Sequence, residues 1–159
     1  MEQNLNLFRT VNNRSVNLIS EITEEVRRNP DVKIYIGTDA QEKSDDYCYV
    51  SAVVFRHGKR GAHVIYRTEK HKKTNNYQKL SREGEMTIKL ADFIREKLPL
   101  VKIEALEFDF NNDFETESTN HVATFKGWAE GLNYRAKVKC VGGECLLSIR
   151  AADNIVKRG

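Results

Sequence analysis

The sequence IYIGTDAQ, residues 34–41, begins as an apolar run rich in isoleucine, which is typical of a buried strand. It then places a single carboxylate, Asp39, where that strand is expected to end. A buried carboxylate destabilises a fold unless a partner compensates its charge. A metal ion is one such partner, so this stretch predicts a core strand that ends at a cation site.

Hydrophobic periodicity and turn residues predict an α/β fold with a five-stranded mixed sheet flanked by helices. The first three strands follow one another through short turns and are expected to be antiparallel, and the last two follow helices and are expected to be parallel. We expect the strands at residues 32–38, 47–56, 62–69, 101–110 and 135–141, and the helices at residues 15–28, 80–97, 118–133 and 149–158.

Size and composition restrict the class of protein. The chain has 159 residues, the size of one domain, and we expect residues 1–159 to form a single domain with its core at about 32–156. No apolar run reaches the ~18 residues of a membrane helix, so we expect no membrane partner. Three cysteines, an odd number, favour a reducing compartment over a disulfide framework, and we expect a cytoplasmic protein.

The charges are unevenly distributed, although the formal net charge is only +3. From Arg56 to Arg82 there are nine Lys or Arg residues and one acid, whereas from Glu107 to Glu117 there are five acids and no Lys or Arg. Solvated loops would explain this pattern. The alternative is a phosphate-binding flank beside a cation site.

Four carboxylates are candidates for that cation site. Asp39 and Asp109 come near the C-terminal ends of the predicted first and fourth strands, where open α/β sheets bind ligands. Glu83 lies in the first turn of the predicted second helix, on its apolar face, and Asp153 lies in the last helix. Oxygen donors from four elements suit Mg²⁺ or Mn²⁺. The structural alternatives are an exposed helix acid for Glu83, a turn cap for Asp109 and a solvated acid for Asp153.

The second helix carries a rival acid, Glu85. The apolar stripe of this helix includes Leu90 and Ile94, and Glu83 lies on the same side. Glu85 falls on the opposite side, so Glu83 is the preferred candidate.

Four segments carry a resemblance to a known family: IGTDAQ (36–41), KLSREGEMTIKLA (79–91), DFNND (109–113) and AAD (151–153). In this order, over about residues 15–156, they resemble the YkuK-type group of predicted RNase H-like proteins, within the ribonuclease H-like superfamily. The resemblance implies an RNase H-like fold and a two-metal nuclease. It implies that Asp39 bridges both metals, with Glu83 and Asp109 as further ligands and Asp153 beside the attacking water.

The predicted function is therefore Mg²⁺- or Mn²⁺-dependent hydrolysis of phosphodiester bonds in RNA, DNA or a hybrid. The basic stretch and the turn after Asp109 supply the candidate substrate-binding residues, which are Lys72, Lys73, Tyr77, Lys79, Arg82 and Asn111. The alternatives are a catalytically silent nucleic-acid-binding module with the same fold, and a structural or oligomerising protein.

Overall fold

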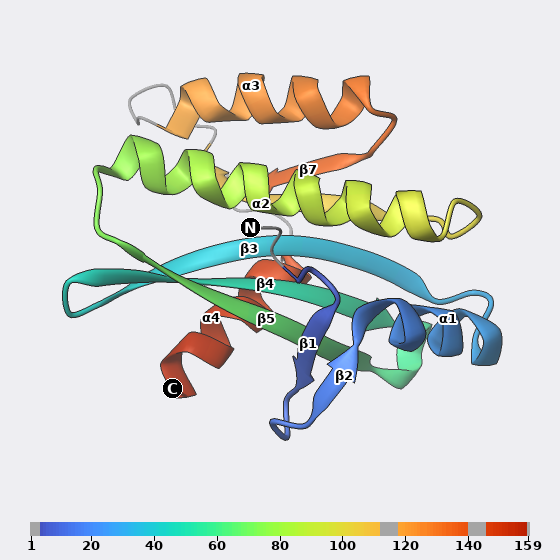
Figure 1. The fold of residues 1–159 in the computed structure, drawn as a ribbon. Helices are drawn as coiled ribbons and strands as arrows, with labels where there is room; N and C mark the ends of the chain where they lie inside the picture. Colours follow the sequence, from blue (N-terminus) through green and yellow to red (C-terminus); the bar gives the residue numbers. More distant parts are fainter. Residues whose placement is uncertain (1–3, 112–117, 140–145, 159) are drawn as a thin grey trace.

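The structure is a computed structural model that describes residues 4–111, 118–139 and 146–158. Within these residues, seven strands form one mixed sheet in the order β2-β1-β5-β4-β3-β6-β7 (Figure 1). The strands are β1 (Leu7–Thr10), β2 (Ser15–Asn17), β3 (Lys33–Lys43), β4 (Asp46–Arg56), β5 (Ala62–Lys72), β6 (Ala105–Asn111) and β7 (Ala136–Lys139).

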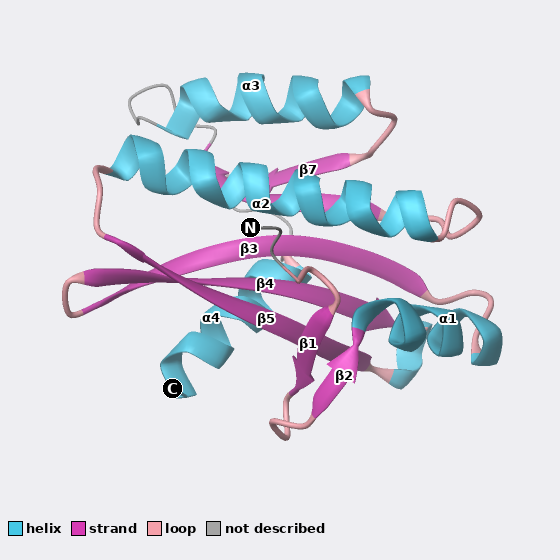
Figure 2. Ribbon diagram, viewed as in Figure 1, coloured by secondary structure: helices cyan, strands magenta, loops and turns pink. Residues whose placement is uncertain are grey.

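The helices lie on both faces of the sheet. In the described residues they are α1 (Leu18–Arg28), α2 (Asn76–Lys97), α3 (Ser118–Gly131) and α4 (Leu147–Arg158). Figure 2 shows α2 and α3 on one face and α4 on the other. The main core lies on the α2 side, where Ile34 and Ile36 of β3 pack with Ile88 of α2. Alternate residues of β3, such as Tyr35, face α4, because successive strand side chains point to opposite faces.

The prediction of an α/β fold with a mixed sheet and flanking helices is confirmed, but the predicted number of five strands is wrong. The two additional strands are β1 and β2, which extend the sheet at β5 through the pair Thr10–Ile65. Both are too short for a clear alternating pattern. Residues 15–17 belong to β2 and not to the first helix, which begins at Leu18 after the capping side chain of Asn17.

Two predicted boundaries near the candidate site are also wrong. Strand β3 does not end at Asp39 but continues to Lys43, because β4 pairs with it as far as the pair Lys43–Asp46. Helix α2 begins at Asn76, one turn before the predicted start. The Asn75 side chain caps it by accepting the Gln78 N–H. Glu83 therefore lies in the second turn of α2.

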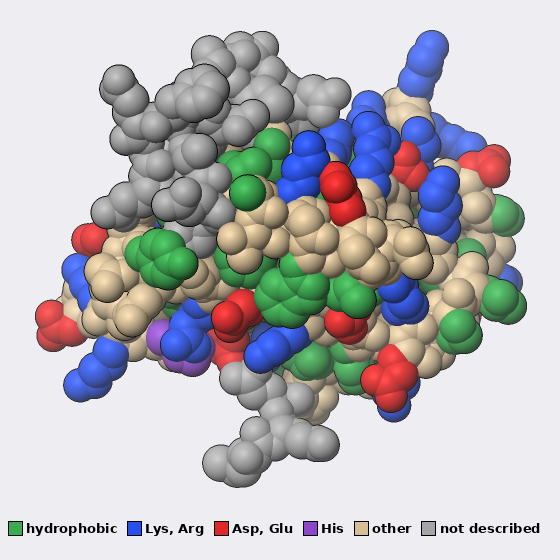
Figure 3. Space-filling model, turned by 90° about the horizontal axis from the view of Figure 1, so that it is seen from above, with side chains coloured by type: hydrophobic (Ala, Val, Ile, Leu, Met, Phe, Trp, Pro, Cys, Tyr) green, Lys and Arg blue, Asp and Glu red, His purple; other side chains and the backbone are tan. Residues whose placement is uncertain are grey.

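The face covered by α2 and α3 has no single sign of charge in the view of Figure 3, where Lys and Arg side chains are interspersed with Asp and Glu. Among the residues that the structure describes, every helix is too short or too polar to cross a membrane.

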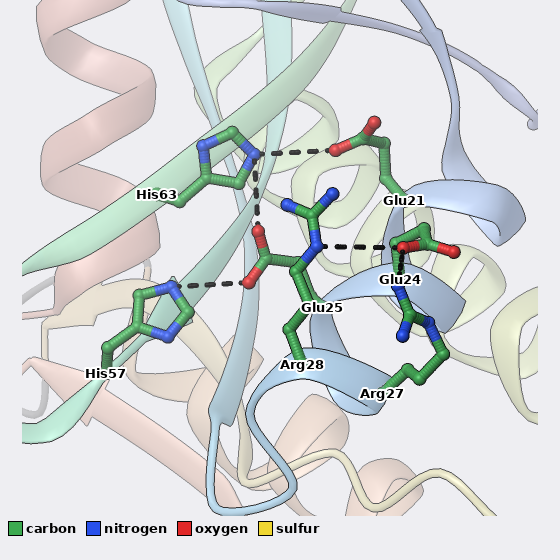
Figure 4. A network of polar contacts seen from close by, with 7 residues as sticks. All are labelled: Glu21, Glu24, Glu25, Arg27, Arg28, His57 and His63. Atoms are coloured by element: carbon green, nitrogen blue, oxygen red, sulfur yellow. Dashed lines mark hydrogen bonds and ion pairs between the residues drawn. The ribbon is translucent and has the colours of Figure 1, made fainter.

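A polar network holds α1 against the β4–β5 hairpin, beside the start of β3 (Figure 4). Glu25 Oε2 lies 3.3 Å from His57 Nε2, and Glu21 Oε2 lies 3.6 Å from His63 Nε2. The ring of His63 also stacks on Phe55 at 5.6 Å between ring centroids. This network links α1 to the sheet and lies away from the candidate acids.

Candidate active site

The candidate site lies where two parallel strands, β3 and β6, separate. Their last paired residues are Gly37 and Glu107. Asp39 and Asp109 come two residues later on each strand, at the same register, so both project to the face of α4. β6 also has a register shift against β7 at this place, a feature that is common beside functional sites. The separation of the strands creates the switch point at which α/β sheets bind ligands.

Asp39 is a strongly perturbed acid. Asp39 is only 6% exposed. Burial and the neighbouring charge of Asp109 raise the pKa of Asp39 to about 6. The charge of Lys79 and a 3.4 Å hydrogen bond from Gln41 Nε2 act in the opposite direction but do not cancel this shift. The charges of Asp39 and Asp109 therefore act on each other.

Glu83 reaches the same place from α2. It is 3% exposed, and its Oε1 accepts the Ala40 N–H at 3.0 Å. The other oxygen, Oε2, is buried and has no hydrogen-bond partner among the described residues. Burial raises the pKa of Glu83 well above its usual value; the Lys79 charge opposes this shift, and the charges of Asp39 and Asp109 add to it. By contrast Glu85 is exposed, so the preference for Glu83 as the inward-facing acid is confirmed.

Buried contacts fix the part of α2 that carries Glu83. The Thr87 hydroxyl lies 3.0 Å from the Glu83 carbonyl oxygen and 3.0 Å from Thr38 Oγ1. Thr38 Oγ1 lies in turn 2.9 Å from Ser51 Oγ on β4. On the other side of α2, a Cβ on Gly84 would come within 2.6 Å of the Phe125 ring of α3, so only glycine fits there without displacement. The Glu83 side chain thus projects from a rigid support.

Asp153 is linked to Asp39 through the side-chain amide of Gln41. Gln41 Nε2 donates to Asp153 Oδ1 at 2.9 Å and lies 3.4 Å from Asp39 Oδ2. Gln41 was not among the predicted site residues. The signal was present in GTDAQ, because residues two apart on a strand share a face.

The beginning of α4 determines where Asp153 lies. Glu107 Oε1 accepts the Ser148 N–H at 2.8 Å, and Glu107 Oε2 accepts the Leu147 N–H at 3.1 Å. A Cβ on Gly37 would come within 2.2 Å of Ser148 Oγ and 3.0 Å of the Glu107 carbonyl oxygen. The glycine of the GTD motif is therefore needed for the close approach of α4 to β3.

The chemistry of the site suits a hard cation, although its present arrangement is not a preformed metal site. Asp39, Glu83 and Asp109 repel one another, and no described residue gives Glu83 Oε2 the partner that a buried carboxylate needs. However, within residues 4–111, 118–139 and 146–158, no group of three or more His, Cys, Asp or Glu residues could hold a metal ion as it stands.

The predicted substrate-binding residues divide between the two faces of the sheet. Lys72 is exposed on β5 and shares the face of Asp39. Lys73 pairs with Glu42 at 3.2 Å, and Arg82 Nη1 lies 3.1 Å from His71 Nδ1, both on the α2 side.

The three remaining predicted residues lie on α2 and β6. Tyr77 is 56% exposed in the first turn of α2. Lys79 is part of the acidic site, with its Nζ 3.8 Å from Glu83 Oε1. The backbone of Asn111 ends β6, but its side chain lies outside the described part of the structure.

Comparison with protein families matches residues 16–157 to the family described as ribonuclease H-like. The chain belongs to the ribonuclease H-like family. Its mixed sheet and flanking helices agree with this ribonuclease H-like assignment, and the predicted superfamily is confirmed. A search of curated proteins gave no match. The ribonuclease H-like fold is associated in general with nucleic acids, which supports the search for a nucleic-acid partner.

Proposed function

We propose that this ribonuclease H-like protein is a metal-dependent nuclease that hydrolyses phosphodiester bonds in RNA, DNA or a hybrid. The observation that carries the proposal is the meeting of Asp39, Glu83 and Asp109 beyond the last β3–β6 pair, with one buried oxygen of Glu83 that has no hydrogen-bond partner among the described residues. Groups whose pKa is perturbed by burial and by like charges mark functional sites more often than structural ones.

The proposed roles follow from the position of each side chain. Asp39, which interacts with the charges of both Glu83 and Asp109, would be shared between the two cations of a two-metal site, and the other two acids would complete it. Mg²⁺ or Mn²⁺ bound there would activate water and stabilise charge on the leaving oxygen. Asp153, held by Gln41, would orient the attacking water.

We further propose membership of the YkuK-type group. Its motifs contribute the residues that surround the site: Gly37 beneath α4, Asp39 and Gln41 on β3, and Glu83 on α2. This agreement between motif and position supports the assignment.

The substrate would lie on the α4 side of the sheet. Asp39 is in register with Val50 and Thr68, so Lys70 and Lys72, two and four residues after Thr68, share its face, and both are exposed. They can hold phosphates close to the acids. Neutralising both should weaken binding of every sequence and reduce its salt dependence, whereas neutralising exposed Lys59 in the opposite turn should not.

A catalytically silent nucleic-acid-binding module is the second candidate. The observation that favours it is the absence, among the described residues, of a preformed group of metal ligands. Such a module would bind nucleic acid through the basic residues and leave the phosphodiester bond intact.

A cleavage assay separates the two functions. Single-stranded RNA, single-stranded DNA and an RNA–DNA hybrid are incubated with the protein in Mg²⁺, in Mn²⁺ and in EDTA. The nuclease proposal expects cleavage with a divalent ion and none for Asp109→Asn, whereas Asp31→Asn, an exposed control in the turn before β3, keeps full activity. Binding without cleavage on all three substrates would favour the silent module, and no binding would contradict both.

A further inference from the structure

Lys79 is an unusual lysine because it lies inside the acidic site. It precedes Glu83 by one turn of α2, and its Nζ lies 3.8 Å from Glu83 Oε1. Its side chain is 22% exposed, whereas Lys89 on the same helix is exposed. A partly buried ammonium group interacts with neighbouring charges more strongly than a solvated one does.

The charge of Lys79 acts on more than its direct partner. It opposes the rise in pKa at Glu83, where it is the largest effect after burial, and also the rise at Asp39 on the neighbouring strand. The charge of Lys79 therefore acts on two of the acids. The 3.8 Å contact with Glu83 and the low exposure establish the same position independently.

The charges decide how many divalent ions fit beside this lysine. When ionised, as ligands of a cation must be, the three acids whose charges act on one another, Asp39, Glu83 and Asp109, carry three negative charges; Asp153, whose Oδ1 accepts from Gln41 Nε2, is a fourth acid outside this count. The ammonium of Lys79 neutralises one and leaves two, the charge of a single Mg²⁺ or Mn²⁺ ion. Two divalent ions would leave the group strongly positive, and each would be repelled by the ammonium.

We infer that the Lys79 ammonium takes one of the two cation positions of the acidic site, so that the protein binds a single divalent ion at a time. The inference rests on the proposed metal-dependent function and modifies its two-metal form. Glu83 Oε1 already contacts Lys79 and the Ala40 N–H, whereas Oε2, which has no hydrogen-bond partner among the described residues, is available to the one divalent ion. The lysine also stabilises the acids before that ion binds.

The experiment measures Mn²⁺ binding in the absence of nucleic acid. Free Mn²⁺ is counted by electron paramagnetic resonance while the protein is titrated, for the unchanged chain, Lys79→Met, Lys79→Gln, Lys79→Arg and the control Lys89→Met. We expect one ion per unchanged chain. Lys79→Met and Lys79→Gln should bind the first ion about tenfold more tightly or better, because a repulsive charge is gone. Lys79→Arg and Lys89→Met should resemble the unchanged chain.

A second measurement uses the same proteins in EDTA. Lys79→Met and Lys79→Gln should melt at a lower temperature than the unchanged chain at pH 8, because the repelling acids lose their counter-charge, and Lys89→Met should not. Two ions bound by the unchanged chain, or an affinity unaltered by removing the ammonium, would overturn the inference and leave the metal-dependent nuclease standing. No ion bound by any of the five proteins would overturn the metal-dependent function itself.

Discussion

Two glutamates, Glu107 on β6 and Glu83 on α2, are similarly buried but have opposite surroundings. Glu107 is 1% exposed and Glu83 is 3% exposed, and burial raises the pKa of both. Both oxygens of Glu107 accept hydrogen bonds from the beginning of α4, including one from Ser148 Oγ at 2.5 Å. Within the described part of the chain, one oxygen of Glu83 accepts a hydrogen bond and the other has no partner, and the charges of two further acids act on it.

The difference distinguishes an acid whose two oxygens the fold satisfies from one that we propose to be functional. A helix N-terminus supplies free N–H groups and a favourable dipole, so Glu107 is stabilised within the chain itself. Glu83 is held in a position where the described residues satisfy only one of its two oxygens. Burial and a raised pKa are therefore insufficient to identify a catalytic acid, and the hydrogen-bond inventory of each oxygen discriminates between the two cases.

The largest expected effect is on cleavage. Glu83→Gln keeps the size of the side chain but removes a charge from the cation site, so we expect cleavage to fall about 100-fold or more. Glu85→Gln, on the exposed side of the same helix, is the matched control and should keep its activity. Initial rates with Mn²⁺ at equal concentrations of folded protein measure this, and an active Glu83→Gln variant would place Glu83 with the structural acids.

The next effect is a gain in stability at Asp39. The pKa of Asp39 is raised to about 6 from the ordinary 3.8, so the folded state binds this proton more tightly than the unfolded state. As pH rises from about 4 to 6 the free energy of unfolding falls, and the loss is complete above 6; two pKa units correspond to about 3 kcal/mol. Asp39→Asn should therefore be more stable than the unchanged chain at pH 8 in EDTA, by up to that amount.

Urea unfolding at pH 4 and pH 8 tests this sign. The two proteins should differ little at pH 4, where the carboxyl is protonated in the folded state. A variant that is less stable at pH 8 would show that Asp39 contributes to the fold, as Glu107 does.

A smaller effect is expected for the isosteric change of the structural acid. Glu107→Gln replaces one acceptor oxygen by an NH₂ group, which cannot accept the Leu147 or Ser148 N–H. We therefore expect the free energy of unfolding to fall by about 2 kcal/mol. The same change at Glu83 should leave the EDTA form as stable or more stable. Urea unfolding midpoints of both variants at pH 8 measure this difference in stability. Equal losses of stability would contradict the distinction between the two glutamates.

The smallest effect concerns Ser148 alone. Ser148→Ala removes the hydroxyl hydrogen bond to Glu107 and keeps both backbone hydrogen bonds, so a loss of about 1 kcal/mol is expected. This corresponds to a melting temperature lower by about 2–4 °C. Ser20→Ala, at an exposed position of α1, is the control. A loss as large as that of Glu107→Gln would assign the stability of the α4 start to the hydroxyl group.

The sequence was sufficient for much of the fold because the longer elements have clear periodicity. It placed Glu83 on the inward face of α2, and it paired Asp39 with Asp109. The predicted end of β3 was wrong because the two edges of this strand pair over different lengths. β3 stops pairing with β6 after Gly37 but pairs with β4 as far as Lys43. The end of the parallel pairing was therefore interpreted as the end of the strand.

Other features of the site depend on contacts between distant segments. Glu107 appeared only as one member of an acidic stretch, because its partners at the start of α4 lie about forty residues away. The link from Gln41 to Asp153 spans 112 residues. By contrast the contact of Lys79 with Glu83 joins residues four apart on one helix, so the sequence could have predicted it.

The hydrogen bond from the Ala40 N–H to Glu83 has a spectroscopic consequence. Beyond the last β3–β6 pair, the Glu83 carboxylate accepts this N–H in place of a carbonyl group of a neighbouring strand. The backbone of β3 is therefore hydrogen-bonded to a side chain of the site. Any event that redistributes charge on Glu83 must alter this bond. The amide resonance of Ala40 in a ¹⁵N–¹H spectrum, and its rate of exchange with deuterium, would then report the occupancy of the site from inside the sheet.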